Sequence, residues 1–315
     1  EEHTRQWQKE MFEMIDRLRF YPCITTWVVF NEGWGQHNTV EIVNKVIKYD
    51  DTRLINGVTG WTDRGVGDMY DVHNYPVTSM ILPENNGNRI SVLGEFGGYG
   101  WAIKEHIWNP NMRNWGYKNI DGAMALIDSY GRLVYDLETL IAQGLSAAVY
   151  TQTTDVEGEV NGLITYDRKV TKIPEGLLHL MHNRLYEITP AKAVTLIADG
   201  QNGSKNTRLV SLNGQELKMT SLPFECPPRS TVVSEATFKV DKDFNHLSLW
   251  LNVAGEAKVW LNGVEVFAQE AKQTRQYNQY NISDYSRYLR KGSNLLRIEV
   301  KDSKKMRFDY GLRAY

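Results

Sequence analysis

Two glutamates in this sequence could do acid–base chemistry, and each follows an apolar run. Glu32 ends the segment at residues 27–32 (WVVFNE), and Glu95 lies in the segment at residues 92–97 (VLGEFG). Such runs are typical of buried strands, so we expect each carboxyl group just past a strand end. Burial raises a carboxyl pKa, and a second carboxylate nearby raises one of the pair further. A protonated and an ionised carboxyl together are what hydrolysis of a glycosidic bond requires.

Either glutamate taken alone has a second interpretation. A carboxylate at a strand end can also cap the following helix or pair with a basic residue. Several aromatic residues at the same strand ends suit stacking on sugar rings, and they could equally pack within loops. These are Trp34, Trp61, Tyr75, Phe96 and Trp101.

Strands and helices alternate over the first part of the chain. Short apolar runs predict strands at residues 25–30, 54–58, 70–74, 90–93 and 146–151. Apolar residues at helical spacing predict helices at residues 7–18, 40–47, 127–141 and 174–185. This alternation favours an α/β domain with parallel strands, in which functional residues gather at the carboxyl ends of the strands.

The pattern changes after about residue 189. Gly, Asn and Ser cluster at residues 199–206, and alternating patterns then predict strands. They cover residues 231–240, 246–253, 257–261, 264–267 and 294–300. Asn262 and Gly263 between two of them indicate a hairpin. We expect residues 190–315 to form an all-β sandwich or jelly roll, with either Leu249 or Trp250, but not both, facing its core.

Composition excludes several other classes of protein. The formal net charge of −2 gives no basis for binding nucleic acid or an anionic membrane surface. No apolar run reaches the roughly 18 residues of a membrane-spanning helix. Two cysteines, Cys23 and Cys226, are too few for a disulfide framework or a cysteine metal site. The seven histidines are scattered without metal-ligand spacing, so we expect no metal and no cofactor.

The two glutamate motifs, in this order and spacing, resemble those of glycoside hydrolase family 2. Asn31-Glu32 after Phe30 is similar to the acid/base motif of the family, and the segment around Glu95 (GEFG) is similar to its nucleophile motif. Residues 17–26 and 150–172 also resemble family segments, so the likeness covers about residues 1–187. It implies that residues 1–189 are strands 4 to 8 of a (β/α)8 barrel, with Glu32 after strand 4 and Glu95 after strand 7.

The resemblance also implies roles for neighbouring residues. Asn31 would hydrogen-bond the sugar 2-hydroxyl, and Tyr75 would hold the nucleophile. His73 and Asn74 would lie close to the bound sugar, although His73 could instead be a structural histidine. Trp34, Trp61 and Trp101 are the further candidates for contacts with the carbohydrate.

The chain departs from the family pattern in what it lacks. Barrel strands 1 to 3 and the family's upstream sugar-binding-like and immunoglobulin-like domains are not recognised, so we expect a fragment whose missing half lies elsewhere in the parent protein or in a partner chain. The all-β part resembles a galactose-binding-like jelly roll at residues 260–263, 280–289 and 292–294. The resemblance further implies an extracytoplasmic location.

The expected activity is that of a retaining β-glycosidase acting on terminal β-linked sugars by double displacement. A β-galactosidase-like activity is favoured because the Asn-x-Lys element of the family's glucuronidases is missing, the nearest asparagine being Asn161 in NGL. The alternative is a non-catalytic carbohydrate-binding protein, or an inactive barrel fragment.

Overall fold

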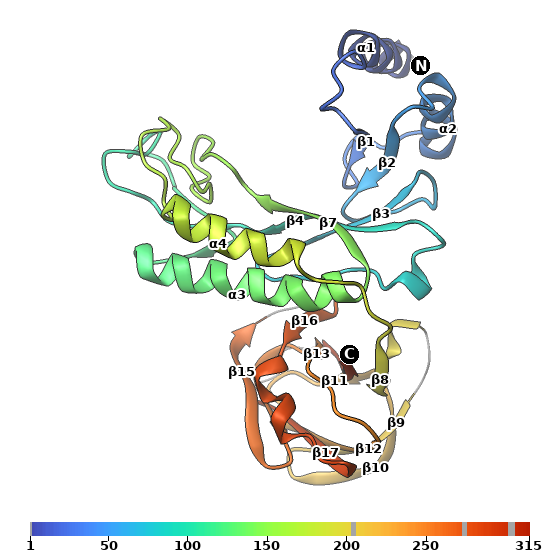
Figure 1. The fold of residues 1–315 in the computed structure, drawn as a ribbon, viewed down its shortest axis with the longest axis vertical. Helices are drawn as coiled ribbons and strands as arrows, with labels where there is room; N and C mark the ends of the chain where they lie inside the picture. The colour runs from blue at the N-terminus through green and yellow to red at the C-terminus, as the bar shows by residue number, and fades with distance from the viewer. Residues whose placement is uncertain (1, 203–205, 273–275, 302–305) are drawn as a thin grey trace. The chain divides into compact units, whose positions relative to one another are not determined.

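The protein is described by a computed structural model that covers residues 2–202, 206–272, 276–301 and 306–315. Within these ranges the chain is mostly β-sheet with four α-helices (Figure 1). It divides into two compact units, one made of Glu1–Gly131 with Gly144–Met181 and the other of Arg132–Gln143 with His182–Tyr315. The division into domains at residues 1–189 and 190–315 stays a prediction.

Five parallel strands form the framework of the first unit. They are β1 (Thr26–Asn31), β2 (Leu54–Thr59), β3 (Met69–Asn74), β4 (Ile90–Gly97) and β7 (Leu145–Thr151). β1 pairs with β2, and β3, β4 and β7 form a second sheet in that order. Asp68 joins the two sheets, because its N–H donates to Ile55 O at 2.8 Å and its side chain accepts from Ile55 N at 2.7 Å. The carboxyl ends of these strands therefore share one edge.

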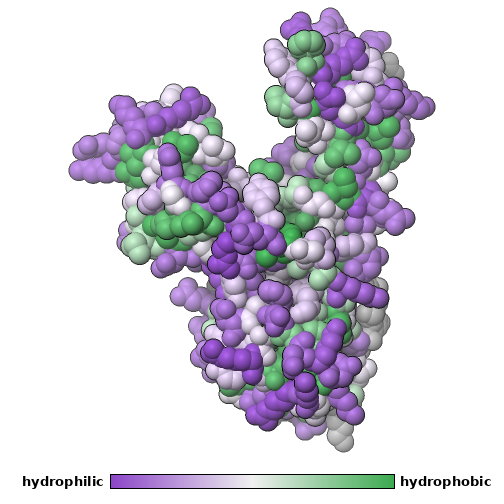
Figure 2. Space-filling model, in the orientation of Figure 1, coloured by the Kyte–Doolittle hydropathy of each residue, from purple (hydrophilic) through white to green (hydrophobic). Residues whose placement is uncertain are grey.

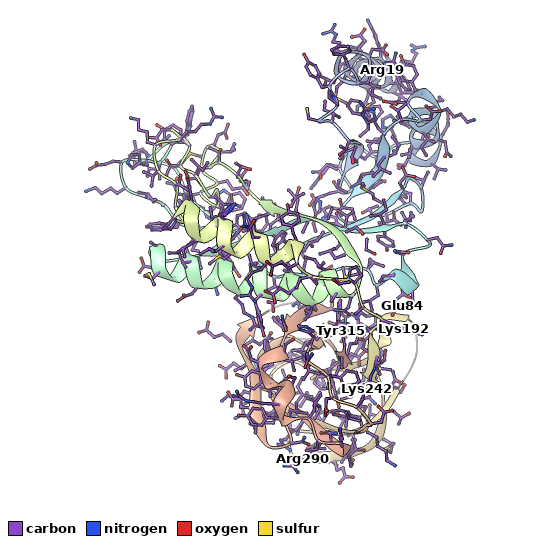
Figure 3. The ribbon with its side chains drawn as sticks, viewed as in Figure 1. Arg19, Glu84, Lys192, Lys242, Arg290 and Tyr315 are labelled. Atoms are coloured by element: carbon purple, nitrogen blue, oxygen red, sulfur yellow. The ribbon has the colours of Figure 1, made fainter. Side chains whose placement is uncertain are left out.

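Four helices accompany these strands, at α1 (Glu2–Leu18), α2 (Thr39–Tyr49), α3 (Ala123–Ala142) and α4 (Glu175–Tyr186). Met11 and Ile15 recur four residues apart on α1, and both are buried in one core with Trp27 of β1. The exposed Arg19 follows the end of α1 (Figure 3) and pairs with Asp16 at 3.2 Å. Two short strands, β5 (Tyr99–Gly100) and β6 (Lys118–Asn119), and a 3₁₀ turn (Pro83–Asn85) complete this part of the chain.

A closed barrel is not present among the described residues. The outer edges of β1 and β7 pair with no other strand in the part of the chain that the structure describes. Apolar side chains also remain on the surface of this unit (Figure 2), including Val28 of β1 at 47% exposure and Val149 of β7 at 56%. None of the described helices is both long and apolar enough to cross a membrane.

The second unit contains two antiparallel sheets. One has the order β10-β9-β12-β17-β14-β15, and the other has the order β11-β18-β13-β16 with β8 also paired to β18. The strands are β8 (Val194–Ile197), β9 (Asn206–Leu212), β10 (Gln215–Leu222), β11 (Phe224–Cys226), β12 (Val232–Val240), β13 (Leu247–Asn252), β14 (Gly255–Leu261), β15 (Val264–Lys272), β16 (Asn278–Asn281), β17 (Gly292–Lys301) and β18 (Met306–Ala314). The predicted hairpin is confirmed, with φ of +50° at Asn262 and +86° at Gly263 between β14 and β15.

Leu249 and Trp250 are both fully buried. As neighbours in β13 they point to opposite faces of the strand, so burial of both agrees with the prediction that only one of them faces the core of the jelly roll. The face that Trp250 shares with Ser248 is covered by the end of α3, where Gln143 Nε2 donates to Ser248 Oγ at 3.2 Å. A central strand covered on both faces is apolar throughout, and alternation then no longer identifies the inner face.

A buried ion pair orders the loop after β7. The Lys172 side chain is 0% exposed and donates to Asp155 Oδ1 at 2.7 Å and to the carbonyls of Trp101 and Val160, each at 2.9 Å. Burial raises the pKa of Asp155 and lowers the pKa of Lys172, and the mutual attraction offsets both shifts in part. The ammonium therefore links Trp101, which follows the short strand β5 (Tyr99–Gly100), to the loop after β7.

We predict that Lys172→Met lowers the free energy of unfolding by about 3–5 kcal/mol, because it leaves the Asp155 carboxylate buried without its cation. The matched control is Lys258→Met, which removes the exposed ion pair with Glu265 at 3.1 Å and should cost less than about 1 kcal/mol. Urea unfolding followed by tryptophan fluorescence measures both. Equal effects of the two variants would contradict a structural role for the buried pair.

Candidate active site

Glu32 follows β1 directly and sits in an unusual backbone conformation. Its N–H donates to Thr59 O at 2.8 Å, so the pairing with β2 continues to this residue. Its φ is +54°, in the left-handed region that residues other than glycine rarely adopt. Backbone strain of this kind is found mainly where the surrounding structure holds a functional side chain in place.

Glu95 lies within β4, just after an irregularity in the sheet. Val72 of β3 pairs with Leu93 of β4, and the next residue of β3, His73, pairs with Glu95. Gly94 has no partner in β3. Gly94 is therefore the extra residue of a β-bulge. Bulges change the direction in which the next side chain points, and they are frequent beside active sites.

His73 joins the two glutamates. Its Nδ1 lies 3.0 Å from Glu32 Oε1 and 3.3 Å from Glu95 Oε2, and its side chain is 2% exposed. One oxygen of each carboxylate and this nitrogen all lie within 4.8 Å of one another. The side chains of Glu32 and Glu95 are 20% and 32% exposed, so solvent reaches both carboxylates but not the imidazole.

Tyr75 holds Glu95 from the end of β3. Its hydroxyl donates to Glu95 Oε2 at 2.6 Å and shares a hydrogen bond with the Thr151 hydroxyl at 2.7 Å. Burial and the bond to Glu95 raise the pKa of Tyr75 far above its ordinary value, so the phenol stays protonated. The ring stacks on Tyr117 at 3.5 Å between centroids. Neither Thr151 nor Tyr117 was predicted from the sequence, since Tyr117 lies in a loop without periodicity.

Two tryptophans lie near the carboxylate oxygen of Glu32 that His73 does not contact. Trp34 Nε1 donates to Glu32 Oε2 at 3.2 Å, and the indole is 73% exposed. Trp61, 49% exposed, meets Trp34 edge to face at 6.2 Å between ring centroids. The exposed indole faces offer a surface on which a ring could stack beside Glu32.

The remaining candidates have other surroundings. Asn31 is exposed, and its Oδ1 accepts from the Thr59 hydroxyl at 2.6 Å. Asn74 is buried at the end of β3. Trp101 is partly buried, and its backbone N–H donates to Val160 O at 2.9 Å. The sugar contacts assigned to these residues stay predictions.

The cluster of Glu32, His73 and Glu95 also has the spacing of three metal ligands. Its oxygens, however, already accept hydrogen bonds from the indole of Trp34 and the hydroxyl of Tyr75. A cation bound to these oxygens would compete with both donors. The donor set therefore favours hydrogen-bonded carboxylates over a metal centre.

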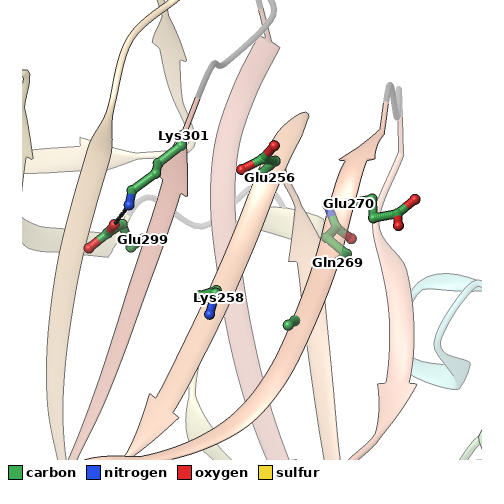
Figure 4. Close-up of a pocket in the computed structure, with 7 residues that line it drawn as sticks. Glu256, Lys258, Gln269, Glu270, Glu299 and Lys301 are labelled. Carbon is green, nitrogen blue, oxygen red and sulfur yellow. Dashed lines mark ion pairs between the residues drawn. The ribbon is translucent and has the colours of Figure 1, made fainter.

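A shallow pocket of about 320 Å³ lies on the outer face of β14, β15 and β17 (Figure 4). Its lining residues are Glu256, Lys258, Ala268, Gln269, Glu270, Glu299 and Lys301. Lys301 pairs with Glu299 at 3.1 Å, and Lys258 pairs with Glu265 at 3.1 Å. The lining contains no aromatic ring on which a sugar could stack, so it offers little support for glycan binding at this face.

Comparisons with known proteins give a weak structural likeness. No protein-family model and no curated protein matches the sequence. An FMN-binding β-glucuronidase from Faecalibacterium prausnitzii L2-6 is similar at 17% identity and a TM-score of 0.30, over 39% of this chain and 23% of that chain. The Ruminococcus gnavus β-glucuronidase is similar at 11% identity and a TM-score of 0.30, over 40% of this chain and 30% of that chain.

A β-D-mannosidase from Dictyoglomus thermophilum is similar at 11% identity and a TM-score of 0.27, over 36% of this chain and 16% of that chain. These structural neighbours are glycoside hydrolases, and this chain spans less than a third of the length of each. TM-scores of this size carry no argument about activity, so the chemistry must be argued from the site itself.

Proposed function

We propose that this chain carries the catalytic carboxylates of a retaining β-glycoside hydrolase, with Glu32 as acid/base and Glu95 as nucleophile. The observation that supports this most is the cluster at the ends of β1, β3 and β4. Two partly exposed carboxylates lie with oxygens within 4.8 Å and share one buried imidazole. A pair this close suits attack by one carboxylate more than activation of a water held between the two.

The reaction would proceed in two displacements. Glu95 Oε1 attacks the anomeric carbon, while Glu32 donates a proton to the glycosidic oxygen and the bond to the leaving group breaks. Water then attacks the glycosyl ester, Glu32 takes its proton, and the Glu95 carboxylate is released with the sugar in its original configuration. Glu95 is assigned as the nucleophile because Tyr75 holds its Oε2 and leaves Oε1 for attack. Glu32 is assigned as the acid because Trp34 and Trp61 beside it provide a place for the leaving group.

The finer assignment is a family 2, β-galactosidase-like enzyme that acts on terminal β-linked sugars. It rests on the two motifs and on the missing Asn-x-Lys element. Asn161 is fully buried and is engaged by Gln152 at 2.9 Å and Glu159 at 2.8 Å, so it is not placed to bind a sugar carboxylate. The alternative, a non-catalytic carbohydrate-binding protein, gives no reason for Tyr75 and His73 to hold a carboxylate pair. An extracytoplasmic location is part of this proposal by resemblance alone.

The five parallel strands are proposed to be strands 4 to 8 of a (β/α)8 barrel. The support is their parallel order, together with the outer edges of β1 and β7, which pair with no strand among the described residues. Val28 and Val149 expose apolar surface on these two strands. Strands from the rest of the parent protein, or from a partner chain, would pair with these edges and complete the rim around the glutamates.

The roles of the glutamates can be tested by azide rescue on an activated aryl β-glycoside. Glu95→Ala should abolish turnover, and azide should then yield a glycosyl azide of inverted configuration. Glu32→Ala should lower the rate on substrates with poor leaving groups by about 10²–10⁴-fold, and azide should yield the retained product. Glu41→Ala, a surface variant on α2, serves as the control. Interchanged azide products would overturn the assignment.

Tyr75→Phe keeps the ring on Tyr117 but removes the donor to Glu95. A hydrogen bond to a charged group contributes about 1.5–3 kcal/mol, so kcat should fall by about 10- to 150-fold. Tyr49→Phe is the matched control, because its hydroxyl donates to Asp16 at 2.8 Å on the surface of α1. Steady-state kinetics of both variants decide this, and an unchanged kcat for Tyr75→Phe would show that the hydroxyl does not support the nucleophile.

We expect the 315-residue chain on its own to be a poor glycosidase that self-associates. Loops from the whole rim of a barrel hold the substrate, and binding away from the reacting bond contributes to the chemical rate. The unpaired strand edges should also promote association. Rates on chromogenic β-glycosides should be compared at equal molarity with a longer parent chain, with light scattering alongside. Equal rates from a monomeric short chain would refute this proposal.

A further inference from the structure

Asp71 is a buried carboxylate that the proposed reaction does not use directly. It lies in the middle of β3, is 2% exposed, and points to the same side of the strand as His73 two residues later. Its Oδ2 accepts from Asn56 Nδ2 on β2 at 2.7 Å, and its Oδ1 accepts from the Gly94 N–H on β4 at 2.7 Å. The carboxylate thus joins three neighbouring strands.

The hydrogen bond from the Gly94 N–H connects Asp71 to the bulge beside Glu95. Gly94 is the bulged residue between Leu93 and Glu95, and the pairing with β7 is irregular over the same stretch. A bulged residue is left out of the ladder of hydrogen bonds, and a buried N–H without an acceptor costs about 1–3 kcal/mol. Asp71 Oδ1 supplies that acceptor. The carboxylate therefore stabilises the bulge immediately before the candidate nucleophile.

The space around this contact requires glycine. A Cβ added to Gly94 would lie 2.3 Å from Asp71 Oδ2, and a Cβ added to Gly60 would lie 2.7 Å from the ring of His73. Neither contact is physically possible without displacement of the neighbour. Because glycine has no Cβ, Asp71 can approach the backbone at Gly94, and His73 can approach the backbone at Gly60.

We propose that Asp71 is a positioning residue that holds the bulge at Gly94 and so directs Glu95 toward His73 and Tyr75. The part concerning catalysis rests on the proposed function, because it takes Glu95 as the nucleophile. The part concerning the bulge does not. Misplacement of a reacting group by about 1 Å is enough to lower the rate by about 10²-fold.

The kinetic test uses a double-mutant cycle between Asp71 and Gly94. Asp71→Ala and Gly94→Ala should each lower kcat by about 100-fold with little change in KM. The double variant should also be about 100-fold slower rather than about 10⁴-fold, because the added Cβ then enters the space that the carboxylate has left. The proposal would be overturned if the double variant were about 10⁴-fold slower, as for independent effects on kcat, or if Asp71→Ala had a wild-type kcat.

Hydrogen exchange followed by mass spectrometry gives a readout that does not depend on activity. Asp71→Asn preserves the volume but turns an amide N–H toward donors, and it should speed exchange in peptides that cover residues 90–97 by at least about tenfold. Asp50→Asn is the control, since Asp50 is a buried carboxylate of the same unit that accepts from Trp27 at 2.9 Å. It should leave those peptides unchanged.

The two readouts separate the inference from the function on which it rests. Faster exchange in a protein that hydrolyses no glycoside would reject the proposed function but retain Asp71 as the residue that holds the bulge. Unchanged exchange and wild-type kcat of Asp71→Asn in an active enzyme would reject the inference and leave the function standing.

Discussion

The candidate site depends on one contact set, in which the buried imidazole of His73 lies within hydrogen-bonding distance of both Glu32 and Glu95. Two carboxylates with oxygens within 4.8 Å repel each other. The imidazole nitrogen lies within hydrogen-bonding distance of both carboxylates and links them. The absence of a side chain at Gly60 makes room for the ring. Without this contact, the strand ends that carry the glutamates would have no common side-chain partner in the described cluster.

The backbone delivers both glutamates by leaving regular strand geometry. Glu32 does so through a positive φ at the end of β1, and Glu95 does so through the bulge at Gly94 in β4. In a regular strand, alternation alone would set the direction of each side chain. The two irregularities turn the carboxylates toward one imidazole. The Glu32 N–H donates to Thr59 O, and the Gly94 N–H donates to Asp71 Oδ1, so the backbone donors at these two points are satisfied.

Periodicity predicted the strands and helices of the first unit well, because amphipathic helices and short apolar strands leave clear patterns. α3 begins at Ala123, four residues before the predicted start. Glu32 follows β1 as predicted, whereas Glu95 lies within β4 and not past its end, because strand pairing continues beyond the bulge. Tyr75 contacts Glu95, as the resemblance implies. The structure places His73 between the carboxylates, and its predicted place beside the bound sugar stays a prediction.

Other features were not accessible from the sequence. A bulge shifts register by one residue and leaves no periodic trace, so the role of Asp71 could not be predicted although its strand was. Thr151 and Tyr117 reach Tyr75 from distant segments, which only tertiary structure brings together. Burial of both Leu249 and Trp250 required a helix on the second face of β13. Each of these is a long-range effect that acts between elements.

The most direct test of the central claim is to trap the proposed covalent intermediate. A parent protein that contains this chain and hydrolyses a β-glycoside would be treated with the matching 2-deoxy-2-fluoro glycosyl fluoride, digested, and mapped by tandem mass spectrometry. We expect a single glycosyl adduct on Glu95, with one adduct per inactivated molecule. An adduct on Glu32 or on any other residue, or inactivation without an adduct, would contradict the central claim.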